Sequence, residues 1–135
     1  MSPFAADLSD AAMADLAAYY AAQTPQPGSG GPGDPARIAA GRLAAERHHC
    51  GACHGATYRG QQYAPRLAGQ HHEYLREQLH AFKSQTRGEL DGSMTTAAQP
   101  LTEDDIENVA QYIASVFRTE PPQAPASGSG GAAGQ

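Results

Sequence analysis

The most regular hydrophobic pattern in the chain lies in residues 102–118. Apolar side chains recur there at the i, i+3, i+4 spacing of an amphipathic helix. Thr102 and Asp105 stand at its start with the three-residue spacing of a capping box. Residues 70–84 show a second helical pattern, with apolar side chains on one side and mostly charged ones on the other. Both segments are therefore predicted to be helices with one buried face.

Residues 35–49 predict a third helix. Asp34 can cap its start, and Pro35 is suited to its first turn. Gly41 lies inside this segment, where a glycine indicates close packing against another element. No part of the chain alternates apolar and polar positions over the length of a strand. The pattern therefore predicts an all-α fold.

The helical pattern repeats within the chain. Residues 8–21 align without gaps on residues 101–114, and the same offset places Met1 on Met94. We therefore expect residues 1–23 to hold the last helix of a preceding, truncated module, with Met1 as a candidate ligand in that module. The alternative is an unrelated alanine-rich helix that follows an ordinary start methionine.

Composition divides the rest of the chain. Residues 24–34 are rich in Pro and Gly and are expected to form a linker. Residues 119–135 consist mainly of Pro, Ala, Ser and Gly and are expected to be disordered. Residues 35–118 are left as one compact module. So small a domain buries limited apolar surface by itself, so we expect a bound cofactor to supply much of its core.

The chemically most specific motif is Cys-x-x-Cys-His at positions 50–54. Cys50 and Cys53 have the spacing that allows two thioethers to the vinyl groups of one porphyrin, and His54 would then lie under the iron as an axial ligand. The motif predicts covalent attachment of haem c. A redox-active dithiol and a zinc site are the alternatives. The first expects a βαβ setting, and the second usually takes another pair of ligands.

A haem that passes electrons without binding small molecules needs a sixth ligand, and a thioether sulfur raises its reduction potential. The chain has three methionines. Met1 is terminal and Met13 belongs to a helical pattern, so we predict that Met94 is the ligand. Its neighbours, Gly, Ser and Thr, predict a loop around it. His71 and His72 would offer bis-histidine ligation instead.

Together these motifs resemble the class I cytochrome c module, most closely the modules of tandem dihaem bacterial cytochromes of the c-four type. The resemblance extends from about Arg37 to Phe117 and is carried by these stretches: residues 50–55, 65–70, 74–82, 94–95 and 101–114. It implies three to five helices packed around one covalently bound haem c. If residues 1–23 belong to a preceding truncated module, the parent protein carries a second haem. The resemblance also implies that the first and last helices of the module cross, with Gly41 near Tyr112.

The resemblance further implies a role for each site residue. Cys50 and Cys53 would carry the haem, and His54 and Met94 would be its axial ligands. The carbonyl of Pro65 would orient the His54 ring through its second nitrogen, which agrees with the general need of a metal-bound imidazole for such an acceptor.

Charge helps to define the partners. The formal net charge is −5, yet residues 35–118 contain nine acidic and nine basic side chains. Without a basic patch the chain is not expected to bind nucleic acid. Lys83 is its only lysine. We expect redox partner proteins to dock on an apolar rim around the haem edge, with weak salt dependence, and a membrane complex is a candidate donor or acceptor.

The resemblance implies one-electron transfer in a bacterial respiratory or related redox chain, without catalysis by the chain itself. The alternative is an electron-entry module or subunit of a larger haem oxidoreductase, of the peroxidase or terminal-oxidase type. Haem attachment implies a periplasmic location. Residues 1–24 contain neither a secretory leader nor an apolar run that could span a membrane, so we expect a leader to have been removed or to lie upstream.

Five further residues are candidates for a supporting role at the haem. Arg59, Arg66 and Arg87 could neutralise the propionates. Tyr58 and Tyr63 could line the crevice with their rings, although loop tyrosines packed on any core would have the same sequence pattern.

Overall fold

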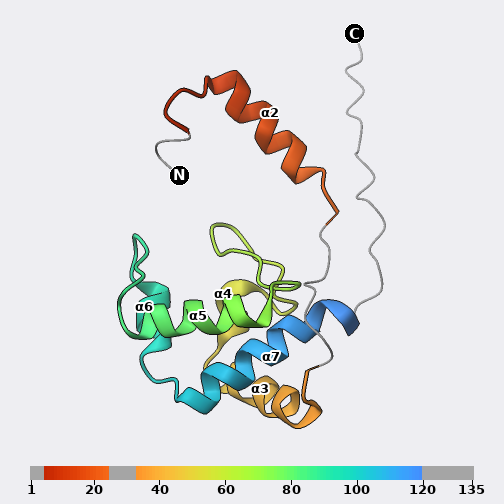
Figure 1. Ribbon diagram of the computed structural model, residues 1–135, viewed down its shortest axis with the longest axis vertical. Helices are drawn as coiled ribbons and strands as arrows, with labels where there is room; N and C mark the ends of the chain where they lie inside the picture. The colour runs from red at the N-terminus through yellow and green to blue at the C-terminus, as the bar shows by residue number, and fades with distance from the viewer. Residues whose placement is uncertain (1–4, 25–32, 120–135) are drawn as a thin grey trace.

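The computed structural model describes residues 5–24 and 33–119, and every regular element in these ranges is a helix. The helices are α2 (Asp10–Ala21), α3 (Pro35–Arg47), α4 (Cys50–His54), α5 (His72–Lys83), α6 (Ser93–Ala98) and α7 (Glu103–Thr119). The all-α prediction is confirmed for the described residues. Residues 33–119 contain the last five of these helices, arranged as one packed unit (Figure 1).

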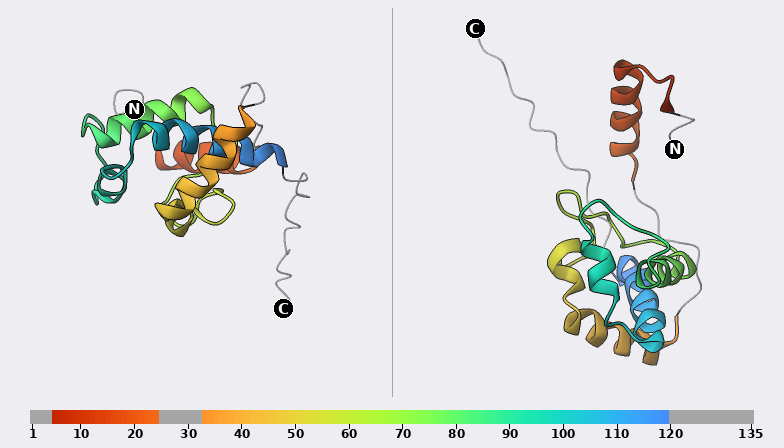
Figure 2. Two further views of the ribbon diagram at one scale, coloured as in Figure 1. Left: turned by 90° about the horizontal axis from the view of Figure 1, so that it is seen from below. Right: turned by 90° about the vertical axis from the view of Figure 1, so that its left-hand side faces the viewer.

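Helix α3 crosses α7 along one side of this unit, as two views show (Figures 1 and 2). Gly41 makes the crossing close. A Cβ atom at this position would lie 2.0 Å from the carbonyl oxygen of Asn108 and 2.7 Å from Cβ of Tyr112. The expected proximity of Gly41 and Tyr112 is confirmed, because only a residue without a side chain allows the two backbones to approach this far.

Helices α5 and α6 complete the core. α5 packs on α7, and α6 packs on α5. One cluster of buried side chains lies between α3, α5 and α7, and includes Ala44, Leu75, Val109 and Ile113. A second cluster lies where α5, α6 and the start of α7 meet, and consists of Phe82, Ala98, Leu101 and Ile106. The helical periodicities in the sequence correspond to these buried faces.

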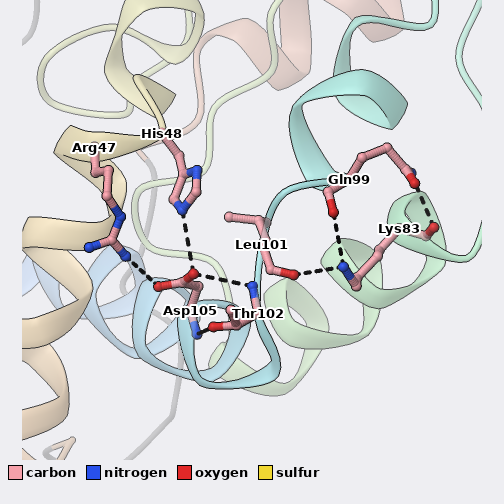
Figure 3. A network of polar contacts seen from close by, with 7 residues as sticks. All are labelled: Arg47, His48, Lys83, Gln99, Leu101, Thr102 and Asp105. Carbon is pink, nitrogen blue, oxygen red and sulfur yellow. Dashed lines mark hydrogen bonds and ion pairs between the residues drawn. The ribbon is translucent and has the colours of Figure 1, made fainter.

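The start of α7 is fixed by the predicted capping box (Figure 3). The Asp105 amide donates to Thr102 Oγ1 at 3.1 Å, and the Thr102 amide donates to Asp105 Oδ2 at 3.1 Å. Arg47 and His48, at the end of α3, contact the same carboxylate at 2.6 and 3.4 Å. The Lys83 ammonium group donates to two carbonyl oxygens in the connection between α6 and α7. These contacts join the end of α3 to the first turn of α7 and the end of α5 to the connection that precedes it.

Replacing Asp105 with asparagine should therefore destabilise the protein in a pH-dependent way. Partial burial alone would raise the pKa of Asp105, but the Thr102 hydrogen bonds and the Arg47 charge hold it below its ordinary value of 3.8. A carboxyl whose pKa is lowered by folding stabilises fully above its unfolded pKa, and this contribution is lost as the pH falls through the folded pKa. We expect a loss of about 1 kcal/mol at pH 7 that shrinks below about pH 4.

Denaturant unfolding at pH 7 and pH 3 measures this difference. Asp104→Asn, at the exposed neighbouring position, is the control and should change the free energy of unfolding by less than about 0.5 kcal/mol. If Asp105→Asn lowers the free energy of unfolding as much at pH 3 as at pH 7, the result would contradict the explanation.

Helix α2 is capped in the same way as α7 but is not packed. Ser9 Oγ accepts a hydrogen bond from the Ala12 amide, the bond that Thr102 accepts from Asp105. Among the described residues α2 contacts no other helix, and none of its side chains is buried. The repeat in the sequence thus corresponds to a repeat in local structure, while the tertiary contacts of α7 have no counterpart around α2.

The predicted helix boundaries agree with the structure to within about two residues, but the two short helices α4 and α6 were not predicted. Residues 35–49, 70–84 and 102–118 correspond to α3, α5 and α7. The loop predicted around Met94 is wrong, because this residue lies in α6. Met1, most of the predicted linker and residues 120–135 of the predicted tail lie outside the described residues.

Candidate functional site

The two cysteines lie on α4, directly after α3. His49 precedes them in the left-handed conformation, with φ 55°, and so turns the chain between the two helices. Cys50 is half-buried and packs against the core, whereas Cys53 is exposed. Neither thiol is in a disulfide. Residues three positions apart share a helix face, so both thiols are available to the same side of a ligand.

The environment of Cys50 differs from that of a reactive dithiol. Burial raises the pKa of its thiol above the ordinary value of 9.0, and the nearby Cys53 raises it further. Redox-active and metal-binding cysteines instead have a lowered thiol pKa. Within residues 5–24 and 33–119 no three His, Cys, Asp or Glu side chains cluster in a way that could hold a metal ion. The geometry gives no support to the dithiol and zinc alternatives.

His54 is buried, with 5% of its surface exposed, and both of its ring nitrogens have a contact. Nδ1 lies 2.9 Å from the carbonyl oxygen of Pro65, and Nε2 lies 3.5 Å from the sulfur of Met94. A carbonyl oxygen only accepts, so Nδ1 must carry the proton. In a neutral imidazole Nε2 then carries a lone pair and no proton. It faces the Met94 sulfur, which also has lone pairs and no proton. This pair of donors has the chemistry of two axial ligands of a metal.

Met94 is brought to this point by α6. Gly92, at φ 68°, precedes the helix, and the Asp91 carboxylate accepts hydrogen bonds from the amide and hydroxyl of Ser93. The Glu89 carboxylate accepts from the amide and hydroxyl of Thr95. The helix has only six residues, including two threonines, so hydrophobic periodicity could not reveal it. Asp91 and Gly92 directly before Ser93 are the signal that could have indicated a helix start.

A cavity is lined by both His54 and Met94 and is bounded by α5, α7 and residues 65–70. It has an empty volume of about 800 Å³, part of it open to solvent. Most of its lining is apolar and comes from helices: Tyr74, Leu75, Leu79, Phe82, Ala110 and Ile113. A flat apolar cofactor edged by polar groups suits such a lining, so the residues present fit a haem.

Polar side chains lie among this lining and include two of the three candidate arginines. Arg66 and Arg87 line the cavity with Gln70 and Gln78, whereas Arg59 does not line it. Arg87 lies over the Phe82 ring, with its guanidinium carbon 4.8 Å from the centroid, and donates to Gln78. Arg66 and Arg87 are thus placed where they could bind acidic groups of a ligand.

The remaining candidates lie elsewhere. Tyr63 is 86% exposed, and Tyr58 is buried in the core beside Cys50 without lining the cavity. His72 lies 2.9 Å from the Glu107 carboxylate on α7. Because His72 is part of this pair and does not line the cavity, the structure gives no support to bis-histidine ligation. No helix in the described ranges is long and apolar enough to cross a membrane.

Comparison with known proteins gives consistent matches. A family model described as Cytochrome c matches residues 38–117. The chain is 36% identical over 124 residues to cytochrome c4 of Thiocapsa roseopersicina, which covers 84% of this chain and 63% of that protein. It is also 36% identical over 129 residues to the thiosulfate dehydrogenase electron acceptor of Stutzerimonas stutzeri (strain A1501), which covers 89% of this chain and 60% of that protein.

Solved structures agree with these matches. A cytochrome c4 structure from Acidithiobacillus ferrooxidans aligns with a TM-score of 0.70 at 32% identity, over 85% of this chain and 69% of that one. The chain spans about three fifths of the length of the curated relatives it matches.

Proposed function

Because the chain belongs to the cytochrome c family, with a class I fold and a covalently bound haem c, we propose that it is a one-electron carrier. The observation that carries this proposal is the convergence of His54 Nε2 and Met94 Sδ, 3.5 Å apart, at an apolar cavity. Both of these donors come from the protein, so the iron would have no open position for a substrate. When bound, the haem supplies a ferric–ferrous couple.

Each site residue has its own role in binding the cofactor. Cys50 and Cys53 would form the two thioethers, and His54 and Met94 would ligate the iron. The Pro65 carbonyl accepts the Nδ1 proton at 2.9 Å, which fixes the ring orientation and makes Nε2 a stronger electron donor. The apolar lining excludes water from the cofactor and so contributes to its potential.

Replacing Met94 with alanine tests the proposed ligation. The variant should retain its covalent haem, because the thiols are untouched, but its reduction potential should fall, because a thioether ligand raises it. The open sixth position should bind carbon monoxide when reduced, whereas the unaltered protein should bind it slowly or not at all. Optical titration with carbon monoxide and potentiometry measure both effects.

Met13→Ala is the matched control, since Met13 lies on α2 and is 45% exposed. It should leave the potential and the carbon monoxide response unchanged. Rapid carbon monoxide binding by the unaltered protein would instead favour a haem enzyme with an open coordination site.

The named relatives are consistent with a carrier that serves other redox proteins. One of them is by name an electron acceptor for a dehydrogenase. We propose that this chain likewise exchanges electrons with partner proteins in the periplasm, as a soluble carrier or in association with a membrane complex. Its role as a subunit of a larger oxidoreductase stays a prediction. Stable co-purification with such a complex would support the subunit role.

We also propose that α2 is the last helix of another module of this kind. Four apolar positions that the repeat aligns are 0–4% exposed at the α7 copy and 37–69% exposed at the α2 copy: Leu101, Ile106, Val109 and Ile113 against Leu8, Met13, Leu16 and Tyr20. The bond from the third helical amide to the capping hydroxyl is present in both copies. These side chains are exposed on α2, whereas their equivalents on α7 are buried. The apolar face of α2 therefore needs a partner surface comparable to the one that α7 packs against.

A mass spectrum of the protein purified from its native host tests this arrangement. The arrangement predicts a single polypeptide that carries two covalent haems. One haem per polypeptide would contradict it without affecting the assignment of His54 and Met94.

A further inference from the structure

Tyr58 has a backbone conformation that its side chain disfavours. Four residues other than glycine have a positive φ in the described ranges, and they are His49, Tyr58, Gln62 and Gln85. Tyr58 is the only one of these four that is buried, with 5% of its surface exposed and φ 55°. The left-handed conformation is disfavoured for a residue with a bulky side chain, whereas glycine adopts it without this cost. The tyrosine ring must therefore contribute something that offsets this cost.

The ring of Tyr58 ties its loop to α7. It meets the ring of Tyr112 edge to face, with centroids 5.8 Å apart and planes at 90°. Tyr112 itself lies at the crossing of α3 and α7, where Gly41 allows close approach. Burial raises the pKa of the Tyr58 hydroxyl, so the ring stays neutral in this environment. The contact with Tyr112 thus holds the Tyr58 ring at the close crossing of α3 and α7.

The backbone of Tyr58 then holds both ends of the segment that supports His54. Its carbonyl oxygen accepts from the amides of Leu67 and Ala68 at 2.8 and 2.9 Å, directly beyond Pro65. Its own amide donates to the carbonyl of Gly55 at 3.0 Å, next to His54. Between these ends the Gly60 amide donates to the His54 carbonyl at 3.0 Å, and Gln61 forms an isolated bridge with Ala64. The bonds of Tyr58 act with these contacts to place the Pro65 carbonyl.

We propose that Tyr58 is a positioning residue for the axial histidine. Its ring, held on Tyr112, fixes the carbonyl that anchors Leu67 and Ala68, and so fixes the 2.9 Å hydrogen bond from His54 Nδ1 to Pro65. That bond determines how strongly Nε2 donates electrons. Tyr58 would therefore act on the reduction potential without touching the cofactor. This inference rests on the proposed ligation by His54.

The test compares Tyr58→Phe with Tyr58→Gly in the haem-loaded full chain. Nuclear magnetic resonance of the reduced protein measures hydrogen exchange of the His54 Nδ1 proton, and potentiometry measures the potential. Phe keeps the ring, so exchange should remain within about twofold of the unaltered rate. Gly removes the ring at a φ that it tolerates, so exchange should accelerate by about tenfold or more, and the potential should rise as the histidine becomes a poorer donor.

A native exchange rate and potential in Tyr58→Gly would overturn the inference. If this variant does not take up haem, Tyr112→Leu decides, because it removes the aromatic contact and leaves the loop sequence intact. It should also accelerate exchange, and an unchanged rate would equally overturn the inference. Ile106→Val, in the second core cluster, is the control for simple loss of stability and should leave the potential unchanged.

The unaltered protein distinguishes failure of this inference from failure of the proposed function. If its spectrum shows no histidine ligation, the proposed function fails. If His54 ligates and neither variant changes the exchange rate, only the role of Tyr58 is refuted.

Discussion

Serine at both Cys50 and Cys53 should leave a chain that binds no haem covalently and is largely unfolded at 25 °C. The site cavity runs between the helices that make the core, and its lining is mostly apolar. Without the cofactor these side chains face water or must collapse on each other. Small domains have a total stability of only about 5–15 kcal/mol, so loss of the central part of the core is enough to remove it.

Circular dichroism and intact mass measure the two parts of this prediction. Ala52→Ser is the matched control, because it adds a hydroxyl at an exposed position inside the same motif. It should retain both haem and helicity. A double-serine variant that unfolds cooperatively at the native midpoint would show that the helices form this core without covalent attachment.

Gly41→Ala is expected to have the second largest effect. The new methyl group would lie 2.0 Å from the Asn108 carbonyl oxygen, so α3 and α7 would have to separate along their whole contact. Overpacking of this kind costs typically 1–3 kcal/mol, and we expect about 3 kcal/mol or more because the obstacle is backbone. For a domain of this size that corresponds to a fall in Tm of roughly 12 °C or more.

Gly88→Ala is the control for this substitution. No atom lies within 4 Å of a Cβ built at Gly88, so the variant should differ from the unaltered protein by less than about 0.5 kcal/mol. Thermal unfolding followed by circular dichroism compares the two. Equal midpoints for Gly41→Ala and Gly88→Ala would contradict the close crossing.

The sequence predicted best those features that depend only on residues close together in the chain. The capping box at Thr102 and Asp105 and the apolar face of α7 follow from side-chain chemistry and helical periodicity, and the structure confirms both. The closeness of Gly41 and Tyr112 came from the family resemblance, because helical spacing alone does not say which helices cross.

Features that depend on distant parts of the chain were not predicted. α6 was expected to be a loop because its six residues have no hydrophobic repeat and its start depends on Asp91 and Gly92. The strained backbone of Tyr58 gave no sequence signal, since its ring is fixed by Tyr112, far along the chain. The convergence of Met94 and His54 was expected from the motif and the family resemblance, but the α5–α6 packing that positions Met94 was not.

The most direct test of the central claim is the optical spectrum of the purified protein in its oxidised and reduced forms. We predict a covalently attached haem that changes reversibly between the ferric and ferrous states and shows an iron–thioether signature, which disappears in Met94→Ala. Colourless protein from a host that matures c-type haem, or a spectrum unchanged by the loss of Met94, would contradict it.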